Sequence, residues 1–375
     1  MQYREFGNLG YKVSQLGYGM MRLPTRGDGK VDREEAVKLI HQAVELGINF
    51  FDSHFGYHGG ESEETLGEAL KGLKREDIFI QTKNPTYNPP ASGRHRERLE
   101  IQLKRLGTDY IDFYLTHSFS WKGFNDYGKD FLKMARQAKD EGVVRHIGFS
   151  FHDTAENLKK IIDTGEFECM LVQYNLLNRA NEEMIGYAHE KGLGVSIMGP
   201  VSGGRLAAPS KEIQKLLPAA SAGSAEVALR FVLAHPGVSV ACSGMNAVEQ
   251  LEENCRTADL TDALTEQELT RIQAILEEKK KLADLYCTGC NYCLPCEQGV
   301  AIPHIFALMN TYRLYGLREW AQKEYARLGP EHWRKRMPAS ECIECGECEE
   351  KCPQKIEIIK QLKEAHQVLS GEGAE

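Results

Sequence analysis

The sequence predicts an α/β protein in which a (β/α)8 barrel, the TIM barrel, is followed by a small, mainly helical domain. Three observations support this prediction. Apolar runs of strand length alternate with amphipathic stretches of helix length from Lys30 to about Ala283. Eight such strand and helix units fill a closed barrel of about 250 residues, and the composition changes abruptly beyond Ala283. We therefore expect the barrel to occupy residues 1–283 and the second domain residues 284–375.

Each strand is predicted from a short apolar run. The eight candidates are Gln15–Gly19, Ile48–Asp52, Ile78–Lys83, Ile111–His117, Val144–Ser150, Met170–Asn175, Gly194–Met198 and Val238–Ser243. Amphipathic segments between them are long enough to cross back over a sheet: Arg33–Leu46, Ser62–Leu73, Arg94–Leu106, Asp126–Glu141, Asn181–Lys191 and Ala225–Ala234. Strict alternation indicates a parallel sheet covered by helices. We also expect an N-terminal hairpin over Tyr3–Val13 and an extra helix over Glu266–Leu282.

A closed barrel fits the sequence better than an open doubly wound sheet. The open sheet that binds dinucleotides carries a G-x-G-x-x-G pattern after its first strand. Here Gly17-Tyr18-Gly19 is followed by two methionines and an arginine, so the pattern is not completed.

Charge and composition exclude several classes of protein. The chain has 375 residues, and 46 basic against 54 acidic side chains give a net charge of −8. This charge predicts no general attraction to nucleic acid or to an anionic membrane. No apolar run approaches the ~20 residues that a membrane helix needs, and residues 1–20 lack the apolar core of an export signal. We therefore expect a cytoplasmic protein that binds neither nucleic acid nor membrane.

Polar residues close most of the predicted strands. They are Asp52, Lys83, His117, Ser150, Gln173 with Asn175, and Ser243. Because the C-terminal ends of the strands surround the active site of a barrel, we expect these side chains to converge.

Three of these side chains, Asp52, Lys83 and His117, suit the reduction of a carbonyl group together with Tyr57 on the loop after Asp52. A phenol has a pKa of about 10, and a nearby ammonium group such as that of Lys83 lowers it. Asp52 would orient Lys83, and His117 would hydrogen-bond the substrate oxygen. The alternative is a structural ion pair beside a loop tyrosine. His54 and His58 flank Tyr57, and either they tune it or they are solvated loop residues.

At these positions the sequence resembles the aldo-keto reductase family over nearly all of residues 1–283. The resemblance is carried by Phe51-Asp52 through Tyr57, Gln81-Thr82-Lys83, Leu115-Thr116-His117, Gly148-Phe149-Ser150, Gln173-Tyr174-Asn175, and Gly244 through Glu249-Gln250 to Glu253-Asn254. It implies a barrel that binds NADP or NAD in an extended form and reduces an aldehyde or ketone to an alcohol. It also implies a catalytic tetrad, with Tyr57 as general acid, made of Asp52, Tyr57, Lys83 and His117.

The same resemblance implies the cofactor contacts. Ser150 and Gln173 would hold the carboxamide, the loop Pro200–Arg205 with Gly203 would cover the pyrophosphate, and Gln250 with Asn254 would face the adenine. Two positions depart from the family pattern. Met198 stands where many members stack an aromatic ring on the nicotinamide. The strip from Gly244 through Met245 and Asn246 to Gln250 lacks the basic residues of NADPH-preferring members. Arg205 or Arg256 could supply that charge, so the preference between NADP and NAD is open.

Eight of the eleven cysteines fall between Cys287 and Cys352. The second run follows the C-x2-C-x2-C-x3-C-P spacing of a cubane iron–sulfur ligand set. The simplest assignment gives one [4Fe-4S] cluster Cys287, Cys290, Cys293 and Cys352, and the other Cys342, Cys345, Cys348 and Cys296. In this assignment each cluster takes its fourth cysteine from the other run, an exchange of ligands. Cys296 departs from the usual pattern because Pro295 precedes it instead of following it, so the exchange is an expectation only. Two zinc sites or disulfides are the alternatives.

The 45 residues between the two cysteine runs carry apolar side chains at helical spacing, namely Ile305, Leu308, Met309, Tyr312 and Tyr315. A helical domain is therefore expected, with Trp320, Tyr325 and Trp333 beyond this stretch. The tail resembles helical two-cluster ferredoxin modules, which a recognised subset of aldo-keto reductases carries. This small iron–sulfur domain completes the expected fold.

Three functions are considered from the sequence, and we expect the first, with the second as its alternative. The first is a nicotinamide-dependent carbonyl reductase, acting on a small-molecule carbonyl substrate, whose clusters are structural. The second is an electron-transfer enzyme whose clusters exchange single electrons with ferredoxin or a flavoprotein partner. The third is a non-catalytic subunit that uses the barrel as a binding scaffold. Glutamates at 341, 344, 347, 349 and 350 would form a docking face for a redox partner or a solvated surface.

Overall fold

The computed structural model describes residues 1–86, 94–208, 210–217, 223–260, 264–284, 287, 291–352 and 355–371. The chain forms two compact units. One contains Met1–Gly203 with Ala228–Leu264, and the other contains Gly204–Val227 with Thr265–Glu375. The domain boundary expected after residue 283 rests on the change in amino-acid composition, whereas the two units are defined by backbone contacts. The expected boundary stays a prediction.

Eight parallel strands close into a barrel in the order β10-β3-β4-β5-β6-β7-β8-β9, which confirms the predicted fold. The strands are β3 (Leu16–Gly19), β4 (Phe50–Asp52), β5 (Phe79–Asn84), β6 (Ile111–Phe119), β7 (Val144–Phe151), β8 (Cys169–Gln173), β9 (Gly194–Met198) and β10 (Val240–Ser243). Each predicted apolar run overlaps one of them, and the bounds differ by at most two residues. The barrel therefore brings the ends of all eight predicted runs to one rim.

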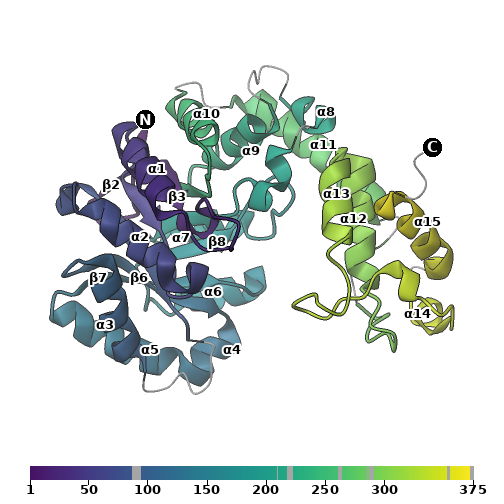
Figure 1. The fold of residues 1–375 in the computed structure, drawn as a ribbon, viewed down its shortest axis with the longest axis horizontal. Coiled ribbons are helices and arrows are strands. Elements are labelled where there is room, and N and C mark those ends of the chain that lie inside the picture. The colour runs from purple at the N-terminus through teal and green to yellow at the C-terminus, as the bar shows by residue number, and fades with distance from the viewer. Residues whose placement is uncertain are drawn as a thin grey trace. The chain divides into compact units, whose positions relative to one another are not determined.

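Helices follow the strands along the chain, and α1, α2, α3 and α5 lie outside the strands (Figure 1). Their bounds are α1 (Arg33–Glu45), α2 (Glu61–Leu70), α3 (His95–Leu106), α4 (Trp121–Gly123), α5 (Lys129–Asp140), α6 (Ala155–Asp163), α7 (Glu182–Glu190), α8 (Lys211–Gln214), α9 (Ser224–Leu233) and α10 (Val248–Asp259). The helix predicted from Asp126 begins at Lys129, because residues 124–128 form a π turn. No segment was predicted for α6 or α10.

A hairpin of β1 (Tyr3–Glu5) and β2 (Lys12–Ser14) precedes the barrel, as predicted. Phe6 follows β1, and its ring centroid lies 4.4 Å from that of Phe113 and 5.5 Å from that of Phe50. Phe50 begins β4 and Phe113 lies near the start of β6. The hairpin segment thus packs at the N-terminal ends of the strands, so chemistry is expected at the opposite ends.

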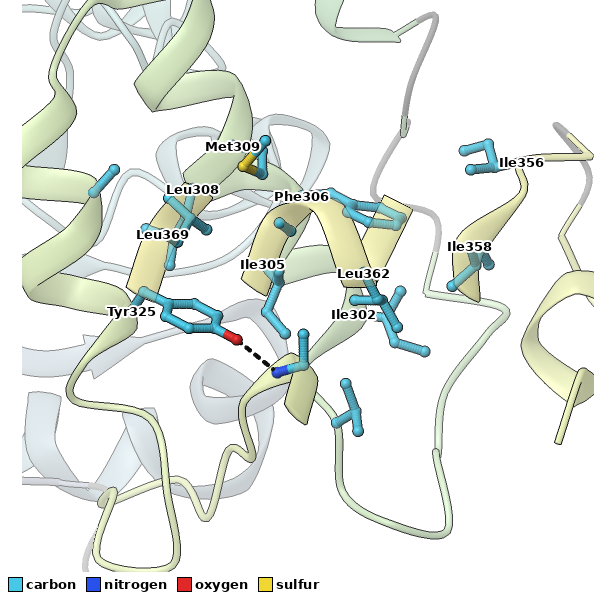
Figure 2. Close-up of a cluster of buried hydrophobic side chains, with 14 of the residues drawn as sticks. Ile302, Ile305, Phe306, Leu308, Met309, Tyr325, Ile356, Ile358, Leu362 and Leu369 are labelled. Atoms are coloured by element: carbon cyan, nitrogen blue, oxygen red, sulfur yellow. Dashed lines mark hydrogen bonds between the residues drawn. The ribbon is translucent and has the colours of Figure 1, made fainter. Parts of the chain in front are cut away.

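The C-terminal unit contains α11 (Glu266–Asp284), α12 (Ile302–Tyr315), α13 (Arg318–Tyr325), α14 (Glu347–Glu350) and α15 (Ile358–Ser370). Apolar residues of α12 and α15, among them Ile305 and Leu362, form its buried core (Figure 2). The Tyr325 hydroxyl accepts a hydrogen bond from the Ala339 backbone N–H at 3.0 Å, which ties the segment before the second cysteine run to this core. The predicted extra helix and helical spacer are therefore present.

The helical stretch ends at α13. Trp333, which the sequence placed beyond the residues at helical spacing, is 78% exposed on a loop. Gly329 adopts a positive φ of 151° and Pro330 follows it, and both features are unfavourable in a helix. No helix within the described ranges has the length and apolar composition needed to cross a bilayer.

Candidate active site

A buried ion pair joins two neighbouring strands at the C-terminal end of the barrel. Asp52 is the last residue of β4, and Lys83 lies near the end of β5. Lys83 Nζ donates to both carboxylate oxygens of Asp52 at 2.8 Å and to the Ser53 carbonyl oxygen at 2.6 Å. The side chain of Lys83 is 1% exposed. Burial by itself lowers the pKa of Lys83, but the charges of Asp52 and Tyr57 outweigh it and the pKa lies above its usual value.

Tyr57 lies beside this ion pair at the start of the 3-10 turn η2 (Tyr57–Gly60). Lys83 Nζ is 5.0 Å from the centroid of the Tyr57 ring. Burial raises the pKa of the Tyr57 hydroxyl, and the charge of Lys83 together with a hydrogen bond from it acts in the opposite direction. The sequence predicted that Lys83 lowers the pKa of Tyr57, but it did not predict that burial raises this pKa by more. Tyr57 is therefore a protonated phenol at neutral pH, as a proton donor must be.

His117 reaches the same site from β6. The pairing of β6 with β7 shifts between Thr116 and Phe119, and Ser118 has a φ of 52°, so the strand is irregular where His117 leaves it. Burial, followed by the nearby His54 and Lys83, lowers the pKa of His117 to about 2. The ring is consequently a neutral imidazole, which can donate or accept a hydrogen bond without carrying charge.

His54 belongs to the site as well, although the sequence only placed it next to Tyr57. Its ring centroid lies 3.9 Å from that of His117 and 5.0 Å from that of Tyr57. Burial, followed by the charge of Lys83, lowers its pKa to about 3. The signal available in the sequence was a histidine two residues after a strand-ending aspartate. His58, by contrast, hydrogen-bonds the Met21 carbonyl oxygen at 3.2 Å.

The loop that carries His54 and Tyr57 is held by hydrogen bonds at several points. Ser53 Oγ pairs with Ser62 Oγ at 2.8 Å. Arg105 Nη1 donates to the Phe55 carbonyl oxygen at 2.8 Å and to the fully buried carboxylate of Glu63 at 3.2 Å. Glu63 also accepts from Gln102 and Thr82. These bonds fix the loop before any ligand binds, which is how a site is preorganised.

The predicted carboxamide contacts lie on neighbouring strands. Ser150 is 1% exposed in β7, and Gln173 is the register partner of Met198. A Cβ on Gly199 would lie 3.0 Å from Gln173 Nε2, so the amide packs against the start of the loop after β9. Asn175 Nδ2 donates to the Gly199 carbonyl oxygen at 2.8 Å and holds that loop.

The predicted adenine contacts are held near β10. Gln250 Oε1 accepts from the Asn246 backbone N–H at 3.1 Å, and Asn254 Nδ2 donates to Ser243 Oγ at 3.3 Å. Pro200 is buried, and Gly203 adopts a φ of 65° in the loop after β9. The side chain of Arg205 lies outside the described residues, and Arg256 is exposed on α10.

Arg22 is a cation that the sequence analysis missed at this end of the barrel. It ends the turn η1 (Met20–Arg22) directly after β3. A Cβ on Gly244 would lie 2.7 Å from Cβ and Cγ of Arg22, and a Cβ on Gly203 would lie 3.4 Å from its Nη2. Arg22 therefore lies between the two glycine-containing loops that resemblance assigned to the cofactor. An arginine directly after the first strand was the available signal.

Thiols from both cysteine runs line one pocket of the C-terminal unit. Its cysteines are Cys293, Cys296, Cys342, Cys345 and Cys348. Burial, followed by the nearby Cys342, raises the pKa of the Cys348 thiol. Cys352 is 7% exposed within the apolar core, and Cys287 packs against that core. Cys290 lies outside the described residues.

The cluster, zinc and disulfide interpretations of the cysteine runs all concern the thiols of this pocket. Cys296, Cys342, Cys345, Cys348 and Cys352 form no disulfide in the structure. Within the part of the chain that the structure describes, no three or more Cys, His, Asp or Glu side chains gather around the position of a single metal ion. A cubane cluster instead takes its thiolates at separate corners. The pocket groups both Cys293 and Cys296 with Cys342, Cys345 and Cys348, so the predicted exchange of ligands between the two clusters stays a prediction.

Comparisons with known proteins agree with both the barrel and the C-terminal iron–sulfur domain. The family model "Aldo/keto reductase family" matches residues 15–277, and the model "4Fe-4S dicluster domain" matches residues 286–357. L-galactose dehydrogenase of Arabidopsis thaliana is 29% identical over 75% of this chain and 96% of its own length. NADH-specific methylglyoxal reductase of Escherichia coli is 29% identical over 53% of this chain and 67% of its own length.

A solved structure supports the same assignment. The holo form of an aldo-keto reductase from Bacillus halodurans superposes with a TM-score of 0.63 at 29% identity, covering 73% of this chain and 96% of that one. Family membership implies a nicotinamide cofactor and a small-molecule carbonyl substrate, and the second match implies 4Fe-4S chemistry. The chain is therefore an oxidoreductase that belongs to the aldo/keto reductase family and carries a C-terminal 4Fe-4S dicluster domain.

Proposed function

We propose that this protein reduces an aldehyde or ketone to an alcohol with NADPH or NADH, and that Tyr57 is the general acid. The observation that carries the proposal is the buried Lys83 ammonium group, which is held by Asp52 and lies beside the Tyr57 ring. A buried cation next to a phenol stabilises the phenolate that proton donation produces. A purely structural ion pair would not need the tyrosine at this position.

A nicotinamide cofactor held by the proposed contacts, among them Ser150 and Gln173, would supply the hydride. Tyr57 donates its hydroxyl proton to the carbonyl oxygen as negative charge develops there. Lys83 stabilises the resulting tyrosinate, and Asp52 keeps the ammonium oriented toward it. His117 is neutral and orients the carbonyl oxygen through a hydrogen bond. The proposed cofactor contacts remain Ser150, Gln173, Pro200, Gly203, Gly244, Gln250 and Asn254. Met198 is proposed to lie beside the nicotinamide.

Arg22 is proposed as a ligand of the cofactor phosphates. Replacing it by alanine is expected to raise the Kd for NADPH about tenfold or more, because a hydrogen bond to a charged group contributes about 1.5–3 kcal/mol. Titration followed by NADPH fluorescence measures this without turnover. Arg26→Ala is the matched control, since Arg26 is an exposed arginine nearby that pairs with Asp28. An unchanged Kd for Arg22→Ala would remove Arg22 from the phosphate site.

The eight cysteines are proposed to hold two [4Fe-4S] clusters with the exchanged ligands described above. The full chain is then expected to contain about eight iron atoms, and Cys345→Ala about four. Iron analysis of anaerobically purified protein measures this content. Cys255→Ala, which changes a cysteine of α10 outside both runs, is the control. Full iron content in Cys345→Ala would contradict the ligand assignment.

Electron exchange with ferredoxin or a flavoprotein partner is the second candidate function. It is favoured by the exposure of Cys345, which would bring one cluster close to the surface. A hydride carries two electrons together, whereas a cubane cluster passes one, so the two cofactors need a mediator. Thiols stay reduced in the cytosol, which is compatible with cluster ligands and supports the proposed cytoplasmic location.

Anaerobic titration with NADPH and then NADH, with and without a test aldehyde, distinguishes the two candidates. The paramagnetic signal of reduced clusters is recorded alongside nicotinamide oxidation. Consumption of aldehyde while the clusters stay oxidised is the result expected for the reductase. Reduction of the clusters by nicotinamide alone would show that the two cofactors exchange electrons and would favour the second candidate. Absence of both reactions would contradict the reductase.

A further inference from the structure

A short loop of the C-terminal unit exposes a tryptophan among cations. This basic loop, residues 331–336, lies between α13 and the second cysteine run. Trp333 is 78% exposed, and Arg334 and Lys335 beside it are exposed as well. Arg334 Cζ lies 4.1 Å from the centroid of the Trp333 ring, so the cation and the ring form one contact surface. Neither carbonyl reduction nor cluster ligation gives these side chains a role.

The positive charges of the basic loop are not neutralised within the described part of the chain. Among those residues, none of Arg334, Lys335 and Arg336 pairs with a carboxylate. Burial, followed by the charge of Arg334, lowers the pKa of Arg336, so the two guanidinium groups repel each other. The loop is thus a local positive patch on a chain whose net charge is −8. An anionic surface placed against it would relieve the repulsion.

Hydrogen bonds within the basic loop fix its shape. The Gly329 backbone N–H donates to the Arg336 carbonyl oxygen at 2.8 Å and closes the loop at its base. The backbone N–H of Lys335 donates to the His332 carbonyl oxygen at 2.6 Å, and that of Arg334 donates to His332 Nδ1 at 3.1 Å. A loop whose backbone is fixed in advance loses little freedom when a partner binds.

The end of the basic loop is joined to the pocket that the thiols line. Met337, the next residue, forms a parallel bridge with Val300, and its backbone N–H donates to the Gly299 carbonyl oxygen at 3.1 Å. Val300 lines the pocket together with Cys296 and Cys342. Because four residues of extended chain span at most about 14 Å, a protein bound to the tip of the loop lies close to this pocket.

The glutamates around the second cysteine run are less suited to docking, because three of the five are engaged within the same unit. Two pair with lysines and one accepts a backbone hydrogen bond: Glu344 with Lys363 at 2.8 Å, Glu347 with Lys351 at 3.0 Å, and Glu349 from the Ile359 N–H at 2.8 Å. These contacts favour the solvated surface over the acidic docking face that the sequence left open.

We propose that the basic loop docks an acidic face of a small electron-transfer protein, with Trp333 at the centre of the contact. Tryptophan and arginine are enriched among the residues that dominate binding at protein interfaces, and opposite charges steer two such surfaces together. In the docked complex one electron leaves the reduced iron–sulfur centre of the partner and reduces one cubane cluster of this chain, with no proton transferred and no bond broken. This inference deepens the second candidate function and rests on it for the partner's role as an electron carrier.

An anionic membrane fits the basic loop less well than a protein does. Polybasic segments that bind such membranes carry about four to eight lysines and arginines. The loop has only Arg334, Lys335 and Arg336. Its connection to the thiol pocket has no use in membrane binding, whereas an electron carrier needs it.

The test measures binding of an acidic plant-type [2Fe–2S] ferredoxin to the full chain, which is purified anaerobically, by isothermal titration calorimetry. Trp333→Ala is expected to raise the Kd about thirtyfold or more, the loss typical of a central interface residue. The variant Arg334→Gln/Lys335→Gln/Arg336→Gln is expected to raise the Kd about tenfold at low salt and to remove most of its dependence on ionic strength. Iron content and thermal midpoint are recorded for each variant.

Arg318→Gln/Lys323→Gln/Lys360→Gln is the matched control, since it removes three exposed cations of the same unit and changes the net charge equally. It is expected to keep the wild-type Kd. Absence of ferredoxin binding by wild type, or wild-type affinity in both loop variants, would overturn the inference. Binding to phosphatidylserine vesicles that Trp333→Ala abolishes would assign the loop to a membrane and would overturn it as well.

Cluster reduction is followed separately, so that docking and electron exchange can fail independently. Reduced ferredoxin is mixed with the full chain, and the paramagnetic signal of the reduced cubane clusters is recorded. Reduction is expected in wild type and about tenfold more slowly in the loop variants at low ferredoxin concentration. Reduction at the wild-type rate in both loop variants would overturn the docking inference alone. Binding that depends on the loop, without any cluster reduction, would support docking and contradict electron exchange.

Discussion

Tyr57→Phe is expected to lower kcat/KM for aldehyde reduction by about 10²–10⁴-fold, the contribution of a positioned general acid. The ring remains and keeps its place beside Lys83 and His54. Only the hydroxyl proton is removed, so the developing negative charge on the substrate oxygen is no longer neutralised. Cofactor affinity and cluster content are expected to stay at wild-type values, because neither depends on that proton.

The measurement is steady-state reduction of an aldehyde under anaerobic conditions, with iron content determined on the same sample. Tyr187→Phe is the control, since it removes a tyrosine hydroxyl from α7 where it donates to Asp163. Turnover by Tyr57→Phe at the wild-type rate would disprove its role as general acid.

The dependence of the wild-type rate on pH provides a second check on Tyr57. A general acid acts in its protonated form, and burial raises the pKa of this phenol. The rate of reduction is therefore expected to stay constant through neutral pH and to decline only above the usual phenol pKa of about 10. A decline between pH 6 and 8, about where a free histidine titrates, would point to another acid.

The sequence predicted the barrel because each strand is a short apolar run and the helices between them are amphipathic. The predicted and the observed bounds of β9 are identical, which shows how well such a run defines a strand. The helix α6 was missed even though Leu158, Ile161 and Ile162 form its buried face. Thr154 caps its first turn by accepting from the Asn157 backbone N–H, so capping and periodicity together could have identified it.

The candidate site was predictable only where chemistry follows from position along a strand. Asp52 and Lys83 end neighbouring strands, so their ion pair follows from the barrel alone. Arg22 and His54 depend on how loops approach each other in space. The proximity of Arg22 to Gly203 and Gly244 requires the closure of β10 against β3, which no local pattern describes. Burial of Tyr57 is likewise a tertiary property, and it reverses the net pKa shift that Lys83 alone would give.

The ion pair between Asp52 and Lys83 gives the largest expected effect on stability. Asp52→Leu is expected to lower the free energy of unfolding by about 3–5 kcal/mol, because it leaves a buried ammonium group without its counter-charge. Only the Ser53 carbonyl oxygen would then remain among the acceptors of Lys83 Nζ given above. Lys83→Met is expected to be costly for the converse reason, since the Asp52 carboxylate keeps Gln81 as a donor at 2.6 Å but loses the cation.

The double variant Asp52→Leu/Lys83→Met separates stability from catalysis. Replacing both charges by apolar groups removes the desolvation cost of each, so its free energy of unfolding is expected to lie above that of either single variant. Aldehyde reduction is expected to be lost in all three, because nothing then stabilises the Tyr57 phenolate. Urea unfolding followed by circular dichroism measures the first effect, and steady-state kinetics measures the second.

Lys38→Met, which breaks an exposed pair with Glu34, should leave both unchanged. If the losses in stability of the two single variants simply added in the double variant, Asp52 and Lys83 would not be energetically coupled. If the double variant retained activity, the ion pair would not be needed to stabilise the Tyr57 phenolate. Either result would contradict the proposed chemistry.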